Sequence, residues 1–164
     1  MSELRVCGFD DLDARTAYEI WRLRQAVFVV EQACPYPDLD GRDPERGTRH
    51  LLLTDDDTGQ DTGDDSGEER LVGYLRLLDD GTLWRIGRVL LAPSHRGRGV
   101  ADRLMHAALA ECARLDPARD VVLDAQSPLA RWYAGFGFEQ TGPEYLEDDI
   151  PHVPMRRSTG SLSR

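Results

Sequence analysis

The sequence predicts a globular fold of the mixed α/β or α+β class in a single domain. Three observations support this prediction: a length of 164 residues, a hydrophobic fraction of 40%, and short apolar runs that alternate with one long amphipathic segment. A chain of this length is large enough to bury a core. We expect the domain to cover residues 1–157 and residues 158–164 to form a disordered, frayed tail.

The first part of the chain is predicted to hold a strand and then a helix. Residues 4–9 form a short apolar run that is typical of a strand. Asp13 is positioned to cap the helix that follows. That helix carries an apolar stripe, most of which is expected to be core: Ala17, Ile20, Trp21, Leu23, Val27 and Phe28.

The loop over residues 31–43 is rich in proline and polar groups, so neither helix nor strand is expected there. A loop of this kind suits a substrate entrance. Asp38, Asp40 and Asp43 resemble a calcium loop only faintly, because the spacing of the glycine and of a final glutamate does not fit. We expect these aspartates to be solvated or paired with arginine, and we predict no metal site.

Two strands of a meander are predicted at residues 50–53 and 71–78, where apolar runs occur. The stretch between them, residues 54–70, is acidic and contains no apolar residue. It cannot bury surface to offset the entropy of ordering, so a mobile hairpin loop is expected. Residues 79–81 predict a tight turn into the next strand.

The stretch that organises the chain is a strand, a glycine-rich turn and a helix. Residues 84–91 predict a buried strand, and residues 102–115 carry apolar side chains at helical spacing. The first turn of a helix exposes backbone N–H groups that have no internal partner, and the helix dipole adds positive charge there. Gly97 and Gly99 permit close approach of a ligand, and Arg96 and Arg98 add positive charge. Residues 96–101 are therefore predicted to cradle a pyrophosphate; the alternative is a tight turn with solvated arginines.

The remaining elements continue the alternation of strands and helices. Pro117 ends the long helix, and residues 121–125 predict another buried strand. Gln126 begins a short helix that runs to Tyr133. The final strands are expected at residues 145–147 and 152–156.

Composition narrows the class of protein. The formal net charge of −10 argues against a nucleic-acid-binding protein, because phosphate contacts need a basic face. No long apolar run and no secretory leader are visible, so we expect no membrane association. Three widely spaced cysteines suggest neither a disulfide framework nor a CxxC metal site, which is typical of a cytoplasmic protein.

Two segments carry a resemblance to a known family. Residues 89–101 match an R/Q-x-x-G-x-G/A signature that follows a strand, and residues 132–138 match a later tyrosine and Gly-Phe element. On these motifs the chain resembles the GNAT acyltransferases, the acetyl-CoA-dependent N-acetyltransferases, over nearly its whole length. Three further segments look like the ElaA branch of that family: residues 32–41, 86–89 and 149–152.

The resemblance implies a mixed central sheet of about seven strands, splayed between the fourth and fifth strands and flanked by helices. It implies acetyl-CoA as a co-substrate and no metal. The backbone of Val89, Leu90 and Leu91 would face the pantetheine arm, and Gln126 would also contact the cofactor. The pyrophosphate would be held by the backbone amides of Arg96, Gly97, Arg98, Gly99, Val100 and Ala101, as the glycine content predicts independently.

The chemistry that the resemblance implies is direct attack of an uncharged amine on a thioester, with a backbone N–H of residues 89–91 stabilising the oxyanion. Tyr133 matches the family's general acid; its alternative role is a core aromatic residue. Residues 84–92 contain no carboxylate, although many relatives carry their base there. Glu31, His50 and His152 remain candidates for the base, directly or through water.

Five residues are candidates for the acceptor site: Cys34, Tyr36, Arg76, Arg88 and His152. Arg76 and Arg88 have equal parity in adjacent predicted strands, so both are able to project from one face of the sheet. They would pair with the loop aspartates or clamp a carboxylate of the substrate. Cys34 raises a rival hypothesis, in which a thiolate carries the acyl group or hydrolyses the thioester.

The leading prediction is an N-acetyltransferase that moves the acetyl group of acetyl-CoA to a primary amine of a small molecule, peptide or protein. The alternatives are a non-catalytic acyl-CoA-binding module and a protein whose glycine turn is purely structural. The sequence names no acceptor, and it leaves a homodimer possible.

Overall fold

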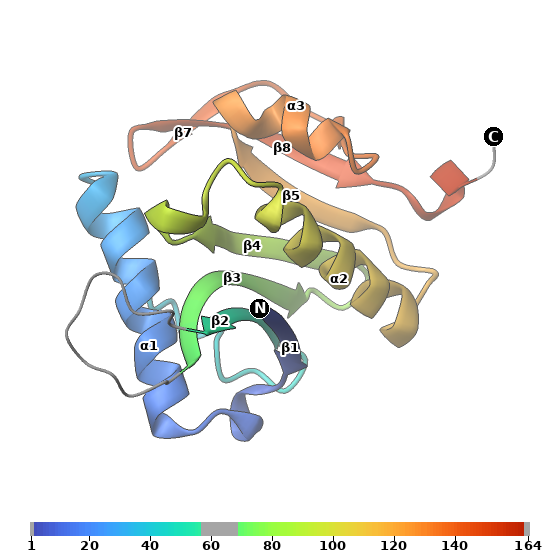
Figure 1. The fold of residues 1–164 in the computed structure, drawn as a ribbon. Coiled ribbons are helices and arrows are strands. Elements are labelled where there is room, and N and C mark those ends of the chain that lie inside the picture. The colour runs from blue at the N-terminus through green and yellow to red at the C-terminus, as the bar shows by residue number, and fades with distance from the viewer. Residues whose placement is uncertain (1, 57–68, 163–164) are drawn as a thin grey trace.

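The computed structural model describes residues 2–56 and 69–162, and these residues form one open eight-stranded sheet with helices on both faces (Figure 1). The strand order is β1-β2-β3-β4-β5-β8-β6, and β7 also pairs with β8. The strands are β1 (Glu3–Cys7), β2 (Arg49–Asp56), β3 (Glu69–Asp79), β4 (Trp84–Leu91), β5 (Val121–Gln126), β6 (Glu139–Gln140), β7 (Tyr145–Glu147) and β8 (Ile150–Arg157). The helices are α1 (Ala14–Arg24), α2 (Val100–Leu115) and α3 (Ala130–Ala134), with shorter turns η1 (Phe9–Asp11), η2 (Gln25–Glu31), η3 (Pro93–His95), η4 (Ser127–Leu129) and η5 (Thr159–Leu162). The predicted α+β class is confirmed.

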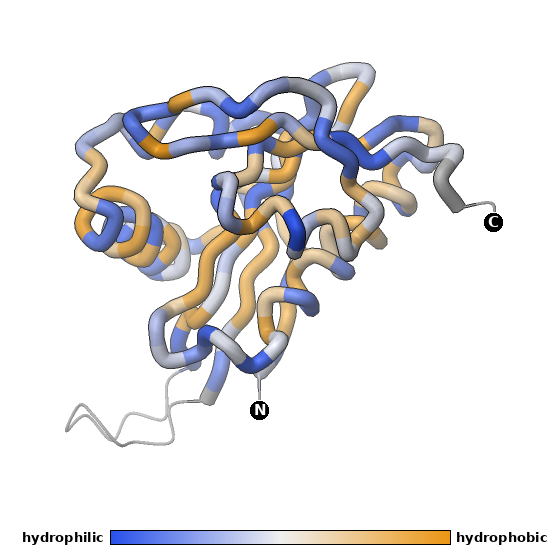
Figure 2. Tube along the Cα trace, turned by 90° about the horizontal axis from the view of Figure 1, so that it is seen from above, coloured by the Kyte–Doolittle hydropathy of each residue, from blue (hydrophilic) through white to orange (hydrophobic). Residues whose placement is uncertain are grey.

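The sheet separates two hydrophobic clusters, because successive side chains of a strand point to opposite faces. Leu51 and Leu53 of β2 pack in the cluster that contains Leu104 of α2. Leu52 between them packs in the cluster that contains Ile20 of α1. Figure 2 shows the hydrophobic residues along the central strands, with helical segments to either side. Helix α1 therefore covers one face and α2 the other.

Helix α1 begins where the sequence predicts. The Asp13 side chain accepts a hydrogen bond from the backbone N–H of Thr16 at 2.8 Å, which satisfies one of the free donors of the first turn. Beyond Arg24 the helix continues as the π-helical segment η2, which the sequence did not reveal. Such wider turns are rare and frequently occur at functional sites.

Strand β4 contains a bulge opposite β3. Tyr74 pairs with Leu90 and Arg76 pairs with Gly87, so two residues of β4, at 88 and 89, face the single intervening residue of β3. Arg88 has a φ of +54°, in the left-handed region that a non-glycine residue seldom adopts. The bulge redirects the side chains of the β4 segment that follows.

Strands β4 and β5 diverge after two paired positions. The parallel ladder consists of Trp84 with Val121 and Arg85 with Val122. Beyond it, β5 pairs with β8 along its whole length, whereas residues 86–91 of β4 have no partner on the β5 side. The predicted splay between the fourth and fifth strands is confirmed.

The C-terminal part departs from the sequence prediction in two details. Strand β6 has only two residues and no apolar pattern, so the prediction of about seven strands missed it. The expected frayed tail includes an ordered turn, η5, whose Thr159 N–H donates to Asp120 Oδ1 at 2.8 Å. Residues 163–164 lie outside the described part of the chain.

The predicted acidic hairpin loop, residues 54–70, is shorter than expected at both ends. Residues 54–56 of β2 pair with residues 69–71 of β3. Residues 57–68, on which the rest of that prediction falls, lie outside the described residues. In residues 2–56 and 69–162, no helix combines the length and the apolar character needed to cross a bilayer.

Candidate functional site

A groove of about 820 Å³ occupies the opening between β4 and β5. Its walls are residues 86–91 of β4, residues 123–126 of β5, and parts of η2, α3 and β8. The glycine-rich turn before α2 lies at one end. The polar loop after η2 and the β7–β8 turn lie at the other, where Tyr36, Asp40 and Asp148 line the wall.

The turn at the first end has the geometry of an anion cradle. Gly97 and Gly99 have φ values of +74° and +69°, which side-chain-bearing residues avoid. A Cβ at either position would meet nothing within 4 Å, so the space above both glycines is open. Within the described residues, no backbone N–H from 97 to 101 has a hydrogen-bond partner. The donors of these five residues, beside the N-terminus of α2, fit a diphosphate.

Arg96 connects this cradle to the end of η2. Its guanidinium donates to both carboxylate oxygens of Glu31, at 2.6 and 2.9 Å, and its Nε donates to the Leu91 carbonyl at 3.2 Å. The hydrogen bonds from Arg96 lower the pKa of Glu31. Glu31 is therefore held as an ion-pair partner, and a lowered pKa makes it a weaker base.

The predicted cofactor residues fall into two groups. Those that line the groove are Val89, Leu90, Leu91, Arg96, Ala101 and Gln126. Gly97, Arg98 and Gly99 lie in the turn between Arg96 and α2, and Val100 is the first residue of α2. The Gln126 side chain donates to Gln32 Oε1 at 3.2 Å, which makes a second link from the end of η2 to the opposite wall.

Tyr133 lines the groove from α3 and is 6% exposed. Its ring makes edge contacts with Trp132 and Phe138, at centroid distances of 4.8 and 6.3 Å. Trp132 anchors α3 to α2 by donating to Asp102 Oδ1 at 2.9 Å. The Tyr133 hydroxyl has no hydrogen-bond partner in the described part of the chain, and burial raises its pKa. The phenol therefore stays protonated at neutral pH.

The far end of the groove rests on a cluster that we call the arginine–aspartate network. It consists of Arg24, Arg76, Arg88, Asp38, Asp40 and Asp43. Arg24 bonds Asp38 at 2.8 Å and Asp43 at 2.5 Å, and Arg76 bonds Asp40 at 2.7 Å and Asp43 at 3.2 Å. The pairing of arginine with the loop aspartates is confirmed.

Arg88 completes the network from the β4 bulge. Its Nε donates to Asp38 Oδ1 at 2.8 Å, and its guanidinium lies 5.7 Å from the centre of the Tyr36 ring. The Tyr36 hydroxyl donates to the same oxygen of Asp38 at 2.9 Å. Burial alone would raise the pKa of Asp40, but the hydrogen bonds from Arg76 outweigh it and lower that pKa. The aspartates have arginine partners, and no group of three or more metal-ligating side chains occurs among the described residues.

Sequence reasoning missed Arg24, which is 0% exposed. The signal was present, because Arg24 follows Ile20 by four residues and precedes Val27 by three, on the buried stripe of α1. An arginine on such a stripe must find anionic partners inside the protein, since a buried unpaired charge is very costly.

His50 does not lie in the groove. It is 1% exposed, its Nδ1 lies 2.6 Å from the Tyr74 hydroxyl, and its Nε2 lies 3.0 Å from the Asp43 carbonyl. Burial lowers the pKa of His50. Both ring nitrogens are occupied behind the network, so this position favours a supporting role for His50 over the expected role of a base.

Cys34 lines the groove but lacks the features of a nucleophile. It is 6% exposed, and its thiol lies 3.4 Å from the Asp148 carbonyl. Burial raises the pKa of the thiol, and the nearby carboxylates of Asp148 and Asp149 raise it further. The hypothesis of a thiolate intermediate is therefore not carried further, and Cys34 instead ties the end of η2 to the β7–β8 turn.

His152 lines the groove from β8, next to Gln126 of β5 and Tyr145 of β7 in the strand register. Its Nδ1 lies 2.7 Å from the Ile150 carbonyl, and its Nε2 lies 3.9 Å from Glu147 Oε2. The imidazole stacks on the Tyr145 ring at a centroid distance of 6.0 Å. Of the candidate bases, His152 is the one that lines the groove beside a carboxylate with no arginine partner among the described residues.

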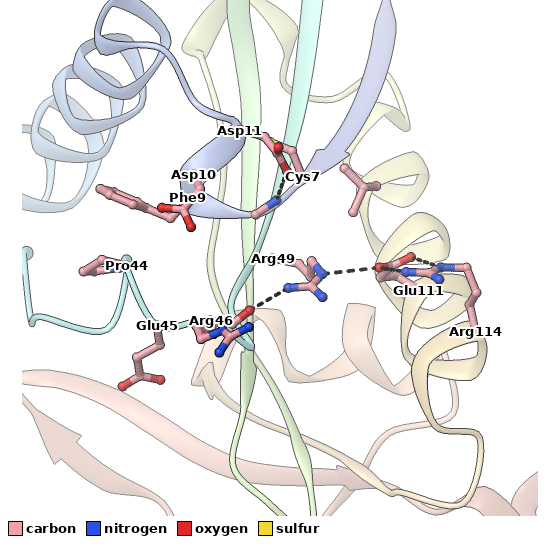
Figure 3. Close-up of a pocket in the computed structure, with 12 residues that line it drawn as sticks. Cys7, Phe9, Asp10, Asp11, Pro44, Glu45, Arg46, Arg49, Glu111 and Arg114 are labelled. Carbon is pink, nitrogen blue, oxygen red and sulfur yellow. Dashed lines mark hydrogen bonds and ion pairs between the residues drawn. The ribbon is translucent and has the colours of Figure 1, made fainter.

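A second groove, of about 570 Å³, lies between β1, the loop before β2 and the C-terminal half of α2 (Figure 3). Arg49 donates to the Arg46 carbonyl at 3.0 Å and lies 3.7 Å from Glu111. Glu111 is also paired with Arg114 at 2.7 Å. These charged groups satisfy one another, and none of the predicted site residues lines this groove.

Comparison with known proteins agrees with this geometry. Residues 65–159 match the family model described as an acetyltransferase (GNAT) domain. The UPF0039 protein Rv2851c of Mycobacterium tuberculosis is 45% identical over 162 residues, which cover 98% of this chain and 97% of that one. Protein ElaA of Escherichia coli is 39% identical over 160 residues, with 96% and 97% of the two chains covered.

Solved structures show the same fold. An acyl-CoA N-acyltransferase from Pseudomonas aeruginosa superposes with a TM-score of 0.83 at 37% identity, covering 96% of this chain and all of that one. The crystal structure of Escherichia coli ElaA gives a TM-score of 0.82 at 36% identity, with 95% and 99% of the two chains covered.

Proposed function

Because this chain belongs to the GNAT acetyltransferase family, we propose that it transfers the acyl group of an acyl-CoA, acetyl-CoA in particular, to a primary amine. The acceptor is the amine of a small molecule, a peptide or a protein. Acyl-CoA is a substrate here, and it supplies an activated thioester carbonyl. The acetyl group and the amine acceptor are the parts of this proposal that go beyond the family.

The observation that carries the proposal is the cradle that opens onto a splayed groove. Five consecutive residues, 97–101, offer backbone N–H groups without partners among the described residues, and two of them are glycines beneath open space. The groove then runs along the free edge of β4, past Val89, Leu90 and Leu91. The N–H groups of the cradle suit a diphosphate, and the free main-chain groups of β4 suit the amide-containing arm that follows it in an acyl-CoA.

Two groups of the chain then support acyl transfer. A backbone N–H on the free edge of β4 is suited to stabilise negative charge on the carbonyl oxygen, as preorganised dipoles do. Tyr133 would donate its phenolic proton to the departing thiolate. Its raised pKa weakens it as an acid, so the proton must be replaced from the amide nitrogen as the carbon–sulfur bond breaks.

The test is release of free thiol from acetyl-CoA in the presence of a panel of amines, compared with propionyl-CoA and longer acyl-CoAs. We expect thiol release that depends on the amine, and Tyr133→Phe should lower kcat by about 100-fold. The variant should bind CoA with unchanged affinity in calorimetry, because it loses only a proton donor. Tyr133→Phe with wild-type kcat would remove Tyr133 from the chemistry.

A second candidate is a non-catalytic acyl-CoA-binding module. The observation that favours it is the absence of a carboxylate in residues 84–92. The same assay discriminates the two functions. Tight binding of acetyl-CoA without turnover across the whole amine panel would support the module and contradict the transferase.

A further inference from the structure

The hydrogen bond of His152 Nδ1 fixes the tautomer of its ring. A backbone carbonyl only accepts, so the 2.7 Å contact to the Ile150 carbonyl requires a proton on Nδ1. In the neutral imidazole the lone pair then lies on Nε2. The His152 side chain is 12% exposed and lines the groove, so this lone pair is available to a group bound there.

Glu147 is placed to stabilise the protonated ring. Its Oε2 lies 3.9 Å from His152 Nε2, too far for a hydrogen bond but close enough for attraction once the imidazole carries charge. Two other carboxylates of this wall have arginine partners, because Asp40 pairs with Arg76 and Asp124 pairs with Arg85; Asp148 lies in the turn beside Cys34. Glu147 pairs with no arginine in the described part of the chain.

The other basic groups of the molecule are less suited to take a proton. Arg96 lowers the pKa of Glu31, and His50 is buried behind the arginine–aspartate network. The remaining histidines, His95 and His106, do not line the groove. A base is needed nonetheless, because an alkylamine with a pKa near ~10.4 is almost fully protonated at neutral pH.

We propose that His152 is the general base of the transfer and that Glu147 positions it and stabilises its charged form. The inference rests on the acyl transfer proposed above. Nε2 takes one proton from the acceptor ammonium, which leaves a neutral amine and an imidazolium. The amine nitrogen then bonds to the thioester carbon, the carbon–sulfur bond breaks, and the thiolate is protonated through Tyr133 as the amide nitrogen loses its second proton. The imidazolium returns its proton to solvent.

Glu147 is the acidic side chain that contacts the His152 ring among the described residues, at 3.9 Å from Nε2. The other titratable and charged groups around the ring are Tyr145 of β7, Asp124 of β5 with its partner Arg85 of β4, Cys34 and Asp148. The groove is also lined by Tyr36, Asp40, Arg42, Arg76 and Arg88. Removing the negative charge of Glu147 must make the imidazolium less stable.

The test is the pH profile of kcat/KM for two peptide acceptors, one with a lysine ε-amine and one with only an α-amine, whose pKa lies near ~7.7–8.0. We expect His152→Gln to lower kcat/KM for the ε-amine about 100-fold at pH 7 and to leave a profile that rises with the neutral fraction of the amine itself. The loss should be smaller for the α-amine, because more of it is already neutral. CoA affinity should be unchanged, which also shows that the variant is folded.

Two further variants keep the inference falsifiable. Glu147→Gln, at an exposed side chain, should leave folding intact and lower kcat/KM for the ε-amine at pH 7 by less than His152→Gln does. His106→Gln, on the exposed surface of α2, is the matched control and should change neither profile. Equal losses for both amines in His152→Gln, or a pH profile that matches that of the wild type, would overturn the role of His152. Absence of turnover by the wild type with every amine would overturn the proposed function itself.

Discussion

The two ends of the groove are built in opposite ways. At the cradle, the ligand-facing groups are main-chain N–H donors of residues 97–101, which include two glycines and the exposed Arg98. At the far end, which we call the acceptor end, the groove rests on side chains, and Arg24, Arg76 and Arg88 are neutralised by three aspartates from one loop. One end is a feature of a single turn, and the other is assembled from four separate segments.

This difference teaches which part of the site tolerates change. The cradle depends on backbone conformation and open space, so a single added methyl group should weaken ligand binding there. The cradle makes few side-chain contacts, so the same change should have a smaller effect on the stability of the fold. The network depends on charge balance in a buried place, so loss of one partner leaves another charge uncompensated. Substitutions at the two ends should therefore separate binding from stability.

The largest expected effect is on stability and comes from the network. Arg24→Met should lower the free energy of unfolding by about 3–5 kcal/mol, because Asp38 and Asp43 stay buried without their main partner. Denaturant unfolding followed by circular dichroism measures it. Arg22→Met is the matched control, because the Arg22 side chain is 57% exposed. It should lower the free energy of unfolding by at most about 1 kcal/mol. Equal losses of unfolding free energy in the two variants would contradict the idea that the acceptor end depends on buried charge balance.

An intermediate effect is expected at the cradle, where binding should change more than stability. Gly99→Ala should weaken CoA binding about tenfold, or about 1.4 kcal/mol, because the new methyl group occupies the open space above the turn. Gly81→Ala is its matched control, since Gly81 has a similar φ of +79° and an added Cβ there would also meet nothing within 4 Å. Both should lose about 1–2 kcal/mol of stability to backbone strain. Weakened CoA binding in Gly81→Ala would show that strain, not the cradle, causes the loss.

The smallest effect concerns the ion pair that joins the cradle to the end of η2. Glu31→Gln should cost less than about 1 kcal/mol, because both side chains of the Glu31–Arg96 pair are more than 40% exposed. Arg96 lowers the pKa of Glu31, so the pair stabilises the fold above the ordinary glutamate pKa of ~4.3 and loses this contribution as pH falls through the lowered value. Thermal unfolding of both proteins between pH 7 and 3 should converge at the acidic end.

The contrast between the ends also explains what the sequence was able to predict. The cradle follows from contiguous residues, so glycine content, a preceding strand and a following helix were sufficient. The splay of β4 and β5 was predicted only from the resemblance to a family, because no local sequence pattern indicates that the β4–β5 ladder ends at Arg85.

The acceptor end resisted prediction because its contacts join residues far apart in the chain. The pairing of Arg76 and Arg88 with the loop aspartates was predicted from strand parity, but Arg24 was overlooked within an apolar stripe. His50 was expected at the site on residue type alone. In the structure, His50 of β2 lies opposite Arg76 of β3 in the strand register, and both of its ring nitrogens have hydrogen-bond partners. The sequence gives no sign of these contacts, because they join distant residues.

The central claim is that the backbone amides of residues 97–101 hold the diphosphate of an acyl-CoA. Calorimetric titration of the wild-type protein with CoA and with pantetheine, which lacks the diphosphate, tests it most directly. We predict binding of CoA that is at least about tenfold tighter than that of pantetheine, a difference of about 1.4 kcal/mol or more. Equal affinities for the two ligands, or no heat from CoA with well-folded protein, would contradict the account.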